Sequence, residues 1–239
     1  MSEPALEVVS TPFGKFQINP KDGIGSTTKA GTLWDGPGFL QPIAREYGEL
    51  GTPGMTILHV GANIGTYSVW LASQDAWRVI AVEPAPLTMQ MLKANLDLNK
   101  ESCADRVIPL EIGAYSHSTA LWLKDWNPNN LGATACTNEP QEVKAWVRGE
   151  PLDAYRWLFG RKVSLVKIDT QGCDGAAIVG LQETIKRDHP AVVFEWEAEF
   201  PAEQGVSWGD LQRAFENWGY AIHPWPSQPN NFLATWSPR

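Results

Sequence analysis

Five short apolar segments are spaced along the chain as the buried strands of a parallel sheet would be. They cover Thr56–Val60, Val79–Val82, Val107–Ile112, Val163–Ile168 and Ala191–Phe194. Strands buried on both faces give nearly continuous apolar runs rich in β-branched residues, whereas strands with one solvated face alternate with polar residues. The five segments therefore predict the centre of a parallel sheet.

Helical patterns fill the intervals between these strands. Apolar side chains recur every three or four positions in residues 66–72, 87–99, 174–187 and 208–218. Alternation of strand and helix is typical of an α/β fold, in which helices cover both faces of a doubly wound, Rossmann-like sheet. Two more short strands, at residues 220–223 and 231–236, bring the expected sheet to about seven strands.

The first residues of the chain have a different pattern. Residues 6–10 and 14–18 alternate around Thr11-Pro-Phe, which predicts a small hairpin, and residues 39–50 have helical spacing. The glycine-rich residues 21–36 between them are predicted to be turns and mobile.

The chain is expected to divide into a capping segment, residues 1–50, and a cofactor-binding domain, residues 51–239. The cap would cover the mouth of the site, although a passive cap or a dimer contact would give the same pattern. Residues 125–140 are polar and irregular, and we interpret them as a mobile substrate loop. Strands are expected on either side of this loop, at residues 119–124 and 142–147.

A glycine turn follows the first strand, and an acid follows the second. The turn is Gly61-Ala62-Asn63-Ile64-Gly65, and Glu83 lies about 20 residues further on. A doubly wound sheet places such an acid against ribose hydroxyls, although Glu83 could instead cap the helix after it. Dinucleotide-binding turns have the pattern G-x-G-x-x-G, in which the middle glycine lets the backbone approach the pyrophosphate. This turn lacks that middle glycine. S-adenosylmethionine has a ribose and no phosphate, so it fits the turn better.

Three motifs in order resemble the FkbM-type class I methyltransferases. They are H-V-G-A-N-I-G-T-Y-S from His59, A-V-E-P from Ala81, and L-V-K-I-D-T-Q-G-C-D-G from Leu165. The resemblance implies S-adenosylmethionine as cofactor and a sheet that ends in an antiparallel pair. It also implies a set of cofactor-binding residues: His59, Gly61, Ala62, Asn63, Gly65, Glu83, Pro84, Ala114 and Asp169.

The chain departs from the family strings at two positions. His59 stands where the family has an aspartate that helps to fix the glycine loop, and Gln171 stands where it has a glutamate. His59 could serve as a hydrogen-bond donor instead. An amide at Gln171 can act neither as a base nor as a carboxylate ligand of a metal.

Two carboxylates are the candidate catalytic groups. Asp169 and Glu195 end the fourth and fifth strands, and sites in doubly wound sheets lie at these carboxyl ends. Either could take the proton of an acceptor hydroxyl. Asp169 could equally be a helix cap or a cofactor contact, and Glu195 a hydrogen-bonded residue at the end of its strand. Lys167 shares a strand face with Asp169 and could pair with it.

The expected substrate contacts add aromatic side chains to this group. The chain has 12 tryptophans, most of which we expect to serve packing. Trp34, Trp126, Trp196 and Trp225 fall in predicted loops or strand ends. Of these, Trp126 and Trp196 join Lys167 and Gln171 as predicted substrate residues: Lys167, Gln171, Trp126 and Trp196.

Composition limits the classes of partner. A net charge of −8 argues against nucleic acid, and no apolar run approaches the roughly 20 residues of a membrane span. Neither a signal peptide nor a C-x-x-C pair is present, and the four histidines are scattered, so a cytoplasmic protein without metal or membrane contact is expected. Its oligomeric state stays open between monomer and homodimer.

These patterns together predict an S-adenosylmethionine-dependent methyltransferase. The expected acceptor is a hydroxyl on a small natural product or sugar. Two alternatives remain: a catalytically altered cofactor-binding protein of the same fold, and a nucleotide- or NAD-dependent enzyme on a similar sheet.

Overall fold

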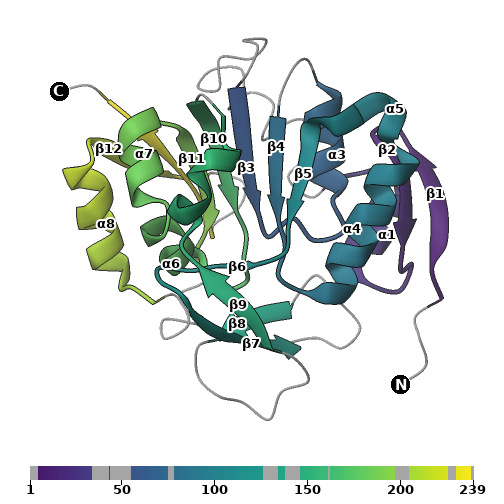
Figure 1. Ribbon diagram of the computed structural model, residues 1–239, viewed down its shortest axis with the longest axis horizontal. Helices are drawn as coiled ribbons and strands as arrows, with labels where there is room; N and C mark the ends of the chain where they lie inside the picture. Colours follow the sequence, from purple (N-terminus) through teal and green to yellow (C-terminus); the bar gives the residue numbers. More distant parts are fainter. Residues whose placement is uncertain are drawn as a thin grey trace.

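A seven-stranded mixed sheet forms the centre of the molecule (Figure 1). The computed structural model describes residues 5–33, 43, 55–74, 78–125, 134–137, 146–160, 162–196, 205–225 and 230–237. The sheet has the order β12-β13-β11-β10-β3-β4-β5. Its strands are β3 (Met55–Val60), β4 (Arg78–Val82), β5 (Val107–Leu110), β10 (Lys162–Ile168), β11 (Ala191–Glu195), β12 (Tyr220–Pro224) and β13 (Asn231–Trp236). Strands β3, β4, β5, β10 and β11 run parallel, and β13 pairs antiparallel with β11 and β12, which confirms the predicted doubly wound α/β sheet.

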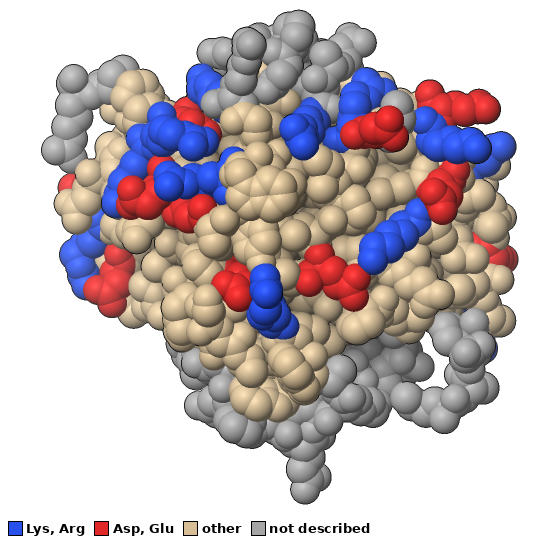
Figure 2. All heavy atoms as spheres, viewed as in Figure 1, with Lys and Arg blue, Asp and Glu red and all other residues tan. Residues whose placement is uncertain are grey.

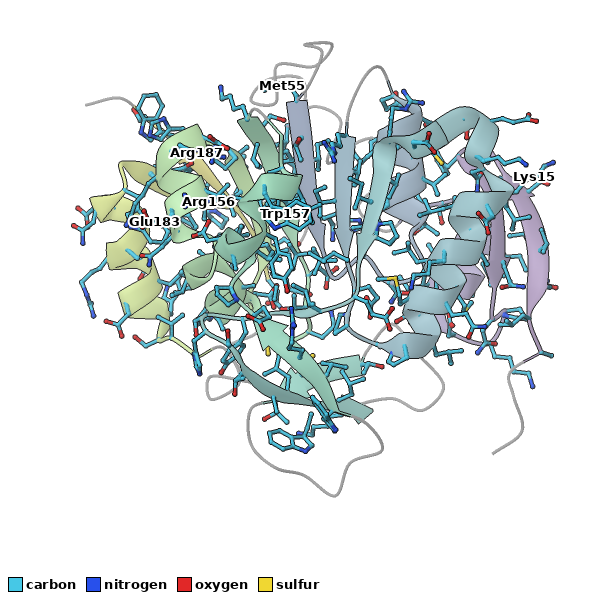
Figure 3. The ribbon with its side chains drawn as sticks, in the orientation of Figure 1. Lys15, Met55, Arg156, Trp157, Glu183 and Arg187 are labelled. Atoms are coloured by element: carbon cyan, nitrogen blue, oxygen red, sulfur yellow. The ribbon has the colours of Figure 1, made fainter. Side chains whose placement is uncertain are left out.

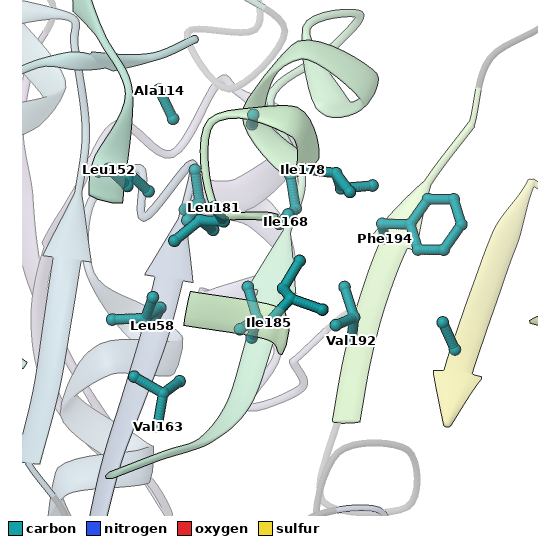
Figure 4. Close-up of a cluster of buried hydrophobic side chains, with 14 of the residues drawn as sticks. Leu58, Ala114, Leu152, Val163, Ile168, Ile178, Leu181, Ile185, Val192 and Phe194 are labelled. Atoms are coloured by element: carbon teal, nitrogen blue, oxygen red, sulfur yellow. The ribbon is translucent and has the colours of Figure 1, made fainter. Parts of the chain in front are cut away.

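Helices cover both faces of this sheet and divide the core into two main clusters. They are α3 (Thr66–Ser73), α4 (Pro86–Leu98), α5 (Lys100–Cys103), η2 (Ala104–Arg106), η4 (Leu152–Leu158), α6 (Asp174–Val179), α7 (Gln182–Asp188) and α8 (Trp208–Asn217). Helices α3 and α4 pack on one cluster, and α6, α7, α8 and η4 pack on the other, which Figure 4 shows in part. Strand side chains alternate between the clusters, as Leu165 and Val166 do in β10.

The single helix predicted over residues 174–187 is two helices. Gly180 and Leu181 separate α6 from α7. A Cβ atom at Gly180 would lie 2.1 Å from the carbonyl oxygen of Tyr115, so the chain turns where two backbones touch. Asp153 then caps α7, since its carboxylate accepts hydrogen bonds from the N–H groups of Glu183 and Thr184.

The N-terminal hairpin is present as β1 (Glu7–Thr11) and β2 (Gly14–Ile18). Part of the segment predicted to be turns is helix α1 (Gly23–Lys29), so that prediction was wrong there. The buried Asp22 begins this helix by accepting a hydrogen bond of 2.5 Å from the N–H of Gly25. The glycines around Asp22 favour a loop in the sequence pattern, whereas its side chain caps a helix in the structure. Most of residues 34–50, which include the helix expected over 39–50, lie outside the described residues.

A second, four-stranded sheet lies below the carboxyl ends of the parallel strands (Figure 1). It has the order β6-β9-β7-β8 and contains β6 (Gly113–Ala114), β7 (Thr119–Asp125), β8 (Thr134–Thr137) and β9 (Trp146–Glu150). Strand β8 falls inside the predicted substrate loop, so the prediction of irregular structure was wrong at these four residues. Short strands of two to four residues carry too little periodicity to be recognised in a sequence, and pairing with distant partners forms them.

Charged side chains of both signs are interleaved on the face shown in Figure 2. Exposed ion pairs of the described residues include Lys93–Glu111 and Lys186–Glu183. Met55, labelled in Figure 3, opens β3 at the edge of the sheet opposite the small sheet. None of the helices in the described part of the chain has the length and hydropathy required to cross a bilayer.

Candidate active site

The glycine turn is fixed against the two strands beside β3. The N–H groups of Gly61 and Ala62 both donate to the carbonyl oxygen of Val82 at 2.9 Å. Gly61 has a φ of +79°, and a Cβ atom there would lie 1.7 Å from the carbonyl oxygen of Asp169. Glycine is therefore required both by the backbone conformation and by the approach of the chain that follows β10.

The remaining N–H groups of the turn are also bonded within the protein. Asn63 donates its N–H to Oε2 of Glu83 at 2.8 Å, and its Oδ1 accepts from the N–H of Ile64 at 2.6 Å. Gly65 donates to the carbonyl oxygen of Ala62 at 2.9 Å. All five N–H groups between residues 61 and 65 thus have protein partners, and none is left for a phosphate.

Glu83 is the acid predicted to hold a ribose, and the structure gives it three donors. Besides Asn63, the N–H of Ala85 and the hydroxyl of Thr88 donate to Oε1 at 2.9 and 2.8 Å. Burial raises the pKa of Glu83, and these hydrogen bonds offset part of that effect. A carboxylate offers about four acceptor positions, so one remains on Oε2 for a ligand hydroxyl.

Strand β8 of the small sheet lies beside Glu83. Burial raises the pKa of the Cys136 thiol to about 12, and the negative charge of Glu83 contributes to the shift. Cys173, just before α6, donates its thiol to the carbonyl oxygen of Cys136 at 3.1 Å. The small sheet is thereby connected to the loop after β10.

Asp169 and Lys167 form an ion pair at the end of β10. Lys167 Nζ lies 3.1 Å from Oδ2 of Asp169, and its side chain is 5% exposed, whereas that of Asp169 is 36% exposed. Burial alone would raise the pKa of Asp169. The Lys167 ammonium and the hydrogen bonds from Gln171 and Lys167 outweigh it and hold that pKa below its usual value. At neutral pH this side chain is therefore an ionised hydrogen-bond acceptor.

Gln171 connects the two candidate catalytic carboxylates. Its Nε2 donates to Oδ1 of Asp169 at 2.8 Å and to Oε2 of Glu195 at 3.2 Å. Its φ of +54° is a left-handed conformation that directs the side chain back over the strand ends. The structure thus brings Glu195 together with Asp169 and Gln171, which lie 24 or more positions earlier in the chain.

His59 is buried beneath this group and does not line an open surface. It is 1% exposed, its Nδ1 shares a hydrogen bond of 2.8 Å with Ser68 Oγ, and its ring meets that of Tyr67 edge-on at 5.7 Å. Burial and the neighbouring Lys167 lower the pKa of His59 to about 3. His59 is therefore neutral and ties β3 to the first turn of α3, while its predicted contact with the cofactor stays a prediction.

The other predicted site residues are dispersed. Trp196 is 8% exposed and packs on Trp208, with ring centroids 5.1 Å apart, so it contributes mainly to the core. Ala114 is buried in the cluster of Figure 4, and Pro84 is half-buried before α4. Trp126 lies outside the described residues, as does Trp34.

Three residues of the site were not predicted: Thr88, Tyr67 and Asp174. Thr88 lies in the first turn of α4, where a hydroxyl can meet an acid just before the helix, and that spacing could have revealed it. Asp174 is buried, and its carboxylate accepts hydrogen bonds from Thr170 and Gly172. Burial and the charge of Asp169 raise its pKa to about 7. No group of three or more potential metal ligands occurs among the residues that the structure describes.

Comparison with known proteins gives the same family as the motifs. Residues 59–222 match the model of the "Methyltransferase FkbM domain". A search of the curated proteins finds no match. A solved structure of methyltransferase FkbM from Methylobacillus flagellatus KT is 15% identical, with a TM-score of 0.54 over 82% of this chain. The present chain spans about half of that one, since the match covers 51% of it.

Two further solved structures have similar folds. A putative rRNA methylase from Clostridium thermocellum is 10% identical, with a TM-score of 0.52 over 84% of this chain and 97% of that one. Fibrillarin from Aeropyrum pernix, solved with natively bound S-adenosyl-L-methionine, is 15% identical, and its TM-score of 0.46 is too low to bear on this chain. That match covers 82% of this chain and 73% of fibrillarin. Because the family match covers more than half of the sequence and the fold is that of class I methyltransferases, the chain belongs to the FkbM methyltransferase family.

Proposed function

We propose that this protein transfers a methyl group from S-adenosylmethionine to a hydroxyl of a small natural product or sugar. The cofactor supplies an electrophilic methyl group on a sulfonium. The acceptor lies at the ends of β10 and β11, beside Asp169, Gln171 and Glu195. We also propose that the protein is cytoplasmic and that its substrate is a small molecule and not a nucleic acid.

The hydrogen bonding of the glycine turn is the observation that carries the choice of cofactor. A pyrophosphate is bound by free N–H groups of such a turn, and here all five donate to protein acceptors. A nucleoside without phosphates needs mainly an acceptor for its ribose hydroxyls, and Glu83 retains one acceptor position. This pattern favours S-adenosylmethionine over NAD or a nucleotide.

Asp169 is the group that orients the acceptor. Its ionised carboxylate is held from one side by Lys167 and from the other by Gln171, and it keeps lone pairs for a third donor. An acceptor hydroxyl that donates to Asp169 has its oxygen fixed in place, and Asp169 or Glu195 can take its proton as the new bond forms. Positioning of this kind supplies much of the rate in a displacement at a methyl group. A carboxylate suits a hydroxyl donor, so we favour O-methylation.

Calorimetric titration of the protein with S-adenosylmethionine and with NAD tests the cofactor. We expect heat of binding with the first compound alone, and binding of NAD alone would contradict the proposal. Incubation of small-molecule extracts with a cofactor labelled in its methyl group, followed by mass spectrometry, then identifies the acceptor. Binding without any labelled product would favour the altered cofactor-binding protein.

The Asp169→Asn variant tests the role of the carboxylate. Because the amide keeps the size of the side chain and loses the charge, we expect turnover to fall by ~10²–10⁴ while cofactor affinity changes much less. Glu195→Gln makes the same change on the neighbouring strand and serves as the matched comparison. An Asp169→Asn variant that turns over at the wild-type rate would remove Asp169 from the mechanism and leave Glu195 as the base.

A further inference from the structure

The surroundings of Lys167 explain how Asp169 is held. Lys167 is 4% exposed, and its ammonium lies 3.1 Å from Asp169 Oδ2 and 5.3 Å from the ring centroid of Tyr67. On the neighbouring strand its direct partner in the register is His59. A charge this deeply buried is stable only if the groups around it compensate it.

His59 is the neighbour of Lys167 that carries no charge. Its hydrogen bond with Ser68 and its edge contact with Tyr67 fix the ring within a buried layer under the site. An aspartate at this position would place a negative charge beside the ammonium. At neutral pH the imidazole contributes packing and a hydrogen bond, and its charge acts on Asp169 only at low pH, where His59 takes up a proton.

We propose that His59 is a positioning residue: by staying uncharged beside Lys167, it directs the attraction of the ammonium to Asp169 and keeps that carboxylate aimed at the acceptor. The inference rests on the proposed function for the use of Asp169, but the arrangement of charges can be tested without it.

Several other charged groups face Asp169 from the elements around it. Glu195 approaches from β11 through the amide of Gln171, and Asp174 approaches from α6. Glu83 lies at the end of β4, where the charge of Asp169 acts on it. Asp169 ionises before its acidic neighbours, and its charge raises the pKa of Asp174 and of Glu83. Its own pKa stays low chiefly because of the ammonium of Lys167.

The isosteric pair His59→Asp and His59→Asn separates charge from shape. The side-chain carboxyl of Asp169 is titrated by carbon-13 NMR in the full chain, without cofactor or acceptor. We expect His59→Asp to move this titration upward by about one pH unit, because the new carboxylate shares the ammonium. His59→Asn should move it upward less than His59→Asp does, because it removes only the charge that His59 carries at low pH and adds no carboxylate. Coincident titrations in the two variants would overturn the proposal.

A second variant keeps the test decisive if His59→Asp does not fold. Lys167→Gln removes the ammonium, so the measured pKa of the Asp169 carboxyl must rise. An unchanged pKa would overturn the proposal. Where methyl transfer is measurable, the acidic limb of kcat/KM should move upward with the titration in His59→Asp. If no methyl transfer is found, the proposed function fails while the titration still decides the role of His59.

Discussion

At the scale of single residues, the side chains of the candidate site form hydrogen bonds that stabilise the surrounding protein, in addition to any contact with a ligand. Glu83 accepts hydrogen bonds from Asn63, Ala85 and Thr88, and so connects the glycine turn to the first turn of α4. Gln171 connects the ends of β10 and β11 by donating hydrogen bonds to Asp169 and Glu195. Substitutions here are expected to affect stability as well as binding.

Replacement of Glu83 by alanine should weaken both properties. Loss of the carboxylate leaves buried donors at Asn63 and Ala85 unsatisfied, so we expect the free energy of unfolding to fall by ~1–3 kcal/mol. S-adenosylmethionine binding should weaken by a similar ~1–3 kcal/mol. Urea denaturation and calorimetry measure the two effects. Thr88→Val removes one donor and leaves the acid, so it should reduce stability with a smaller loss of affinity. Unchanged affinity in Glu83→Ala would rule out the ribose assignment.

Two buried groups give stability opposite dependences on pH. The pKa of His59 falls from 6.5 to about 3 on folding, so between these values only the unfolded chain binds the proton, and stability rises with pH. The pKa of Asp174 rises from 3.8 to about 7, so in that window only the folded chain keeps the proton, and stability falls as pH rises. Between about pH 4 and 6.5 the two contributions oppose one another.

Single variants should separate these contributions. Asp174→Asn should make stability rise more steeply with pH between 4 and 6.5, and His59→Asn should make it rise less steeply. Each slope should change by at most ~1.4 kcal/mol per pH unit, the value for one proton. Urea denaturation at several pH values is the measurement. Slopes equal to that of the wild type in both variants would show that neither group titrates as described.

At the scale of elements, Asn95 on α4 and Asn99 directly after it bind the open edge of the N-terminal hairpin as a third strand would. Asn95 and Asn99 each accept the N–H and donate to the carbonyl oxygen of one residue in β2, Gln17 and Lys15 respectively. Asn95 also donates to the carbonyl oxygen of Ile64 in the glycine turn at 2.7 Å. The buried side chain of Asn95 thus connects the hairpin to the glycine turn.

Asn95→Ala should loosen both attachments. The buried N–H of Gln17 loses its acceptor, so we expect a loss of ~1–3 kcal/mol in stability and faster hydrogen exchange in β2. Gln90→Ala, on the exposed face of the same helix, is the matched control and should have little effect on either. Equal exchange in β2 in the two variants would mean that the asparagine does not hold the hairpin.

At the scale of the whole molecule, the small sheet closes the carboxyl edge of the large one. Cys136 in β8 and Cys173 just before α6 belong to one buried cluster, while Cys103 is buried in α5. Local opening of a few short strands should require less free energy than global unfolding. A ligand against Glu83 should oppose opening of the small sheet in particular.

Thiol labelling can test this arrangement. At a concentration 100 times its Kd, S-adenosylmethionine should slow labelling of Cys136 by up to ~100-fold, because opening at β8 requires the ligand to leave. Cys103, which is remote from Glu83, should be protected less. Mass spectrometry of labelled peptides measures both rates in one sample. Equal protection of the two thiols would indicate global unfolding and no separate opening of the small sheet.

The sequence by itself determined the sheet, its cofactor turn and the family. Long apolar runs such as that of β10 and helical spacing such as that of α8 are local signals, and a glycine turn followed by an acid is recognisable because its spacing along the chain reflects the fold. The expected sheet also selected Asp169 and Glu195 as candidate catalytic groups, because site residues of a doubly wound sheet lie at the carboxyl ends of its strands.

Only the tertiary structure decided how these groups act. The hydrogen bond from Gln171 to Glu195 spans 24 positions, and that from Asn95 to Gln17 spans 78, so neither leaves a periodic signal in the chain. Strand β8 and the break at Gly180 exist because distant backbones meet there. The neutral state of His59 and the low pKa of Asp169 depend on burial and on the position of Lys167. Local patterns determine which elements form, and the free energy of contacts between elements determines what their side chains can do.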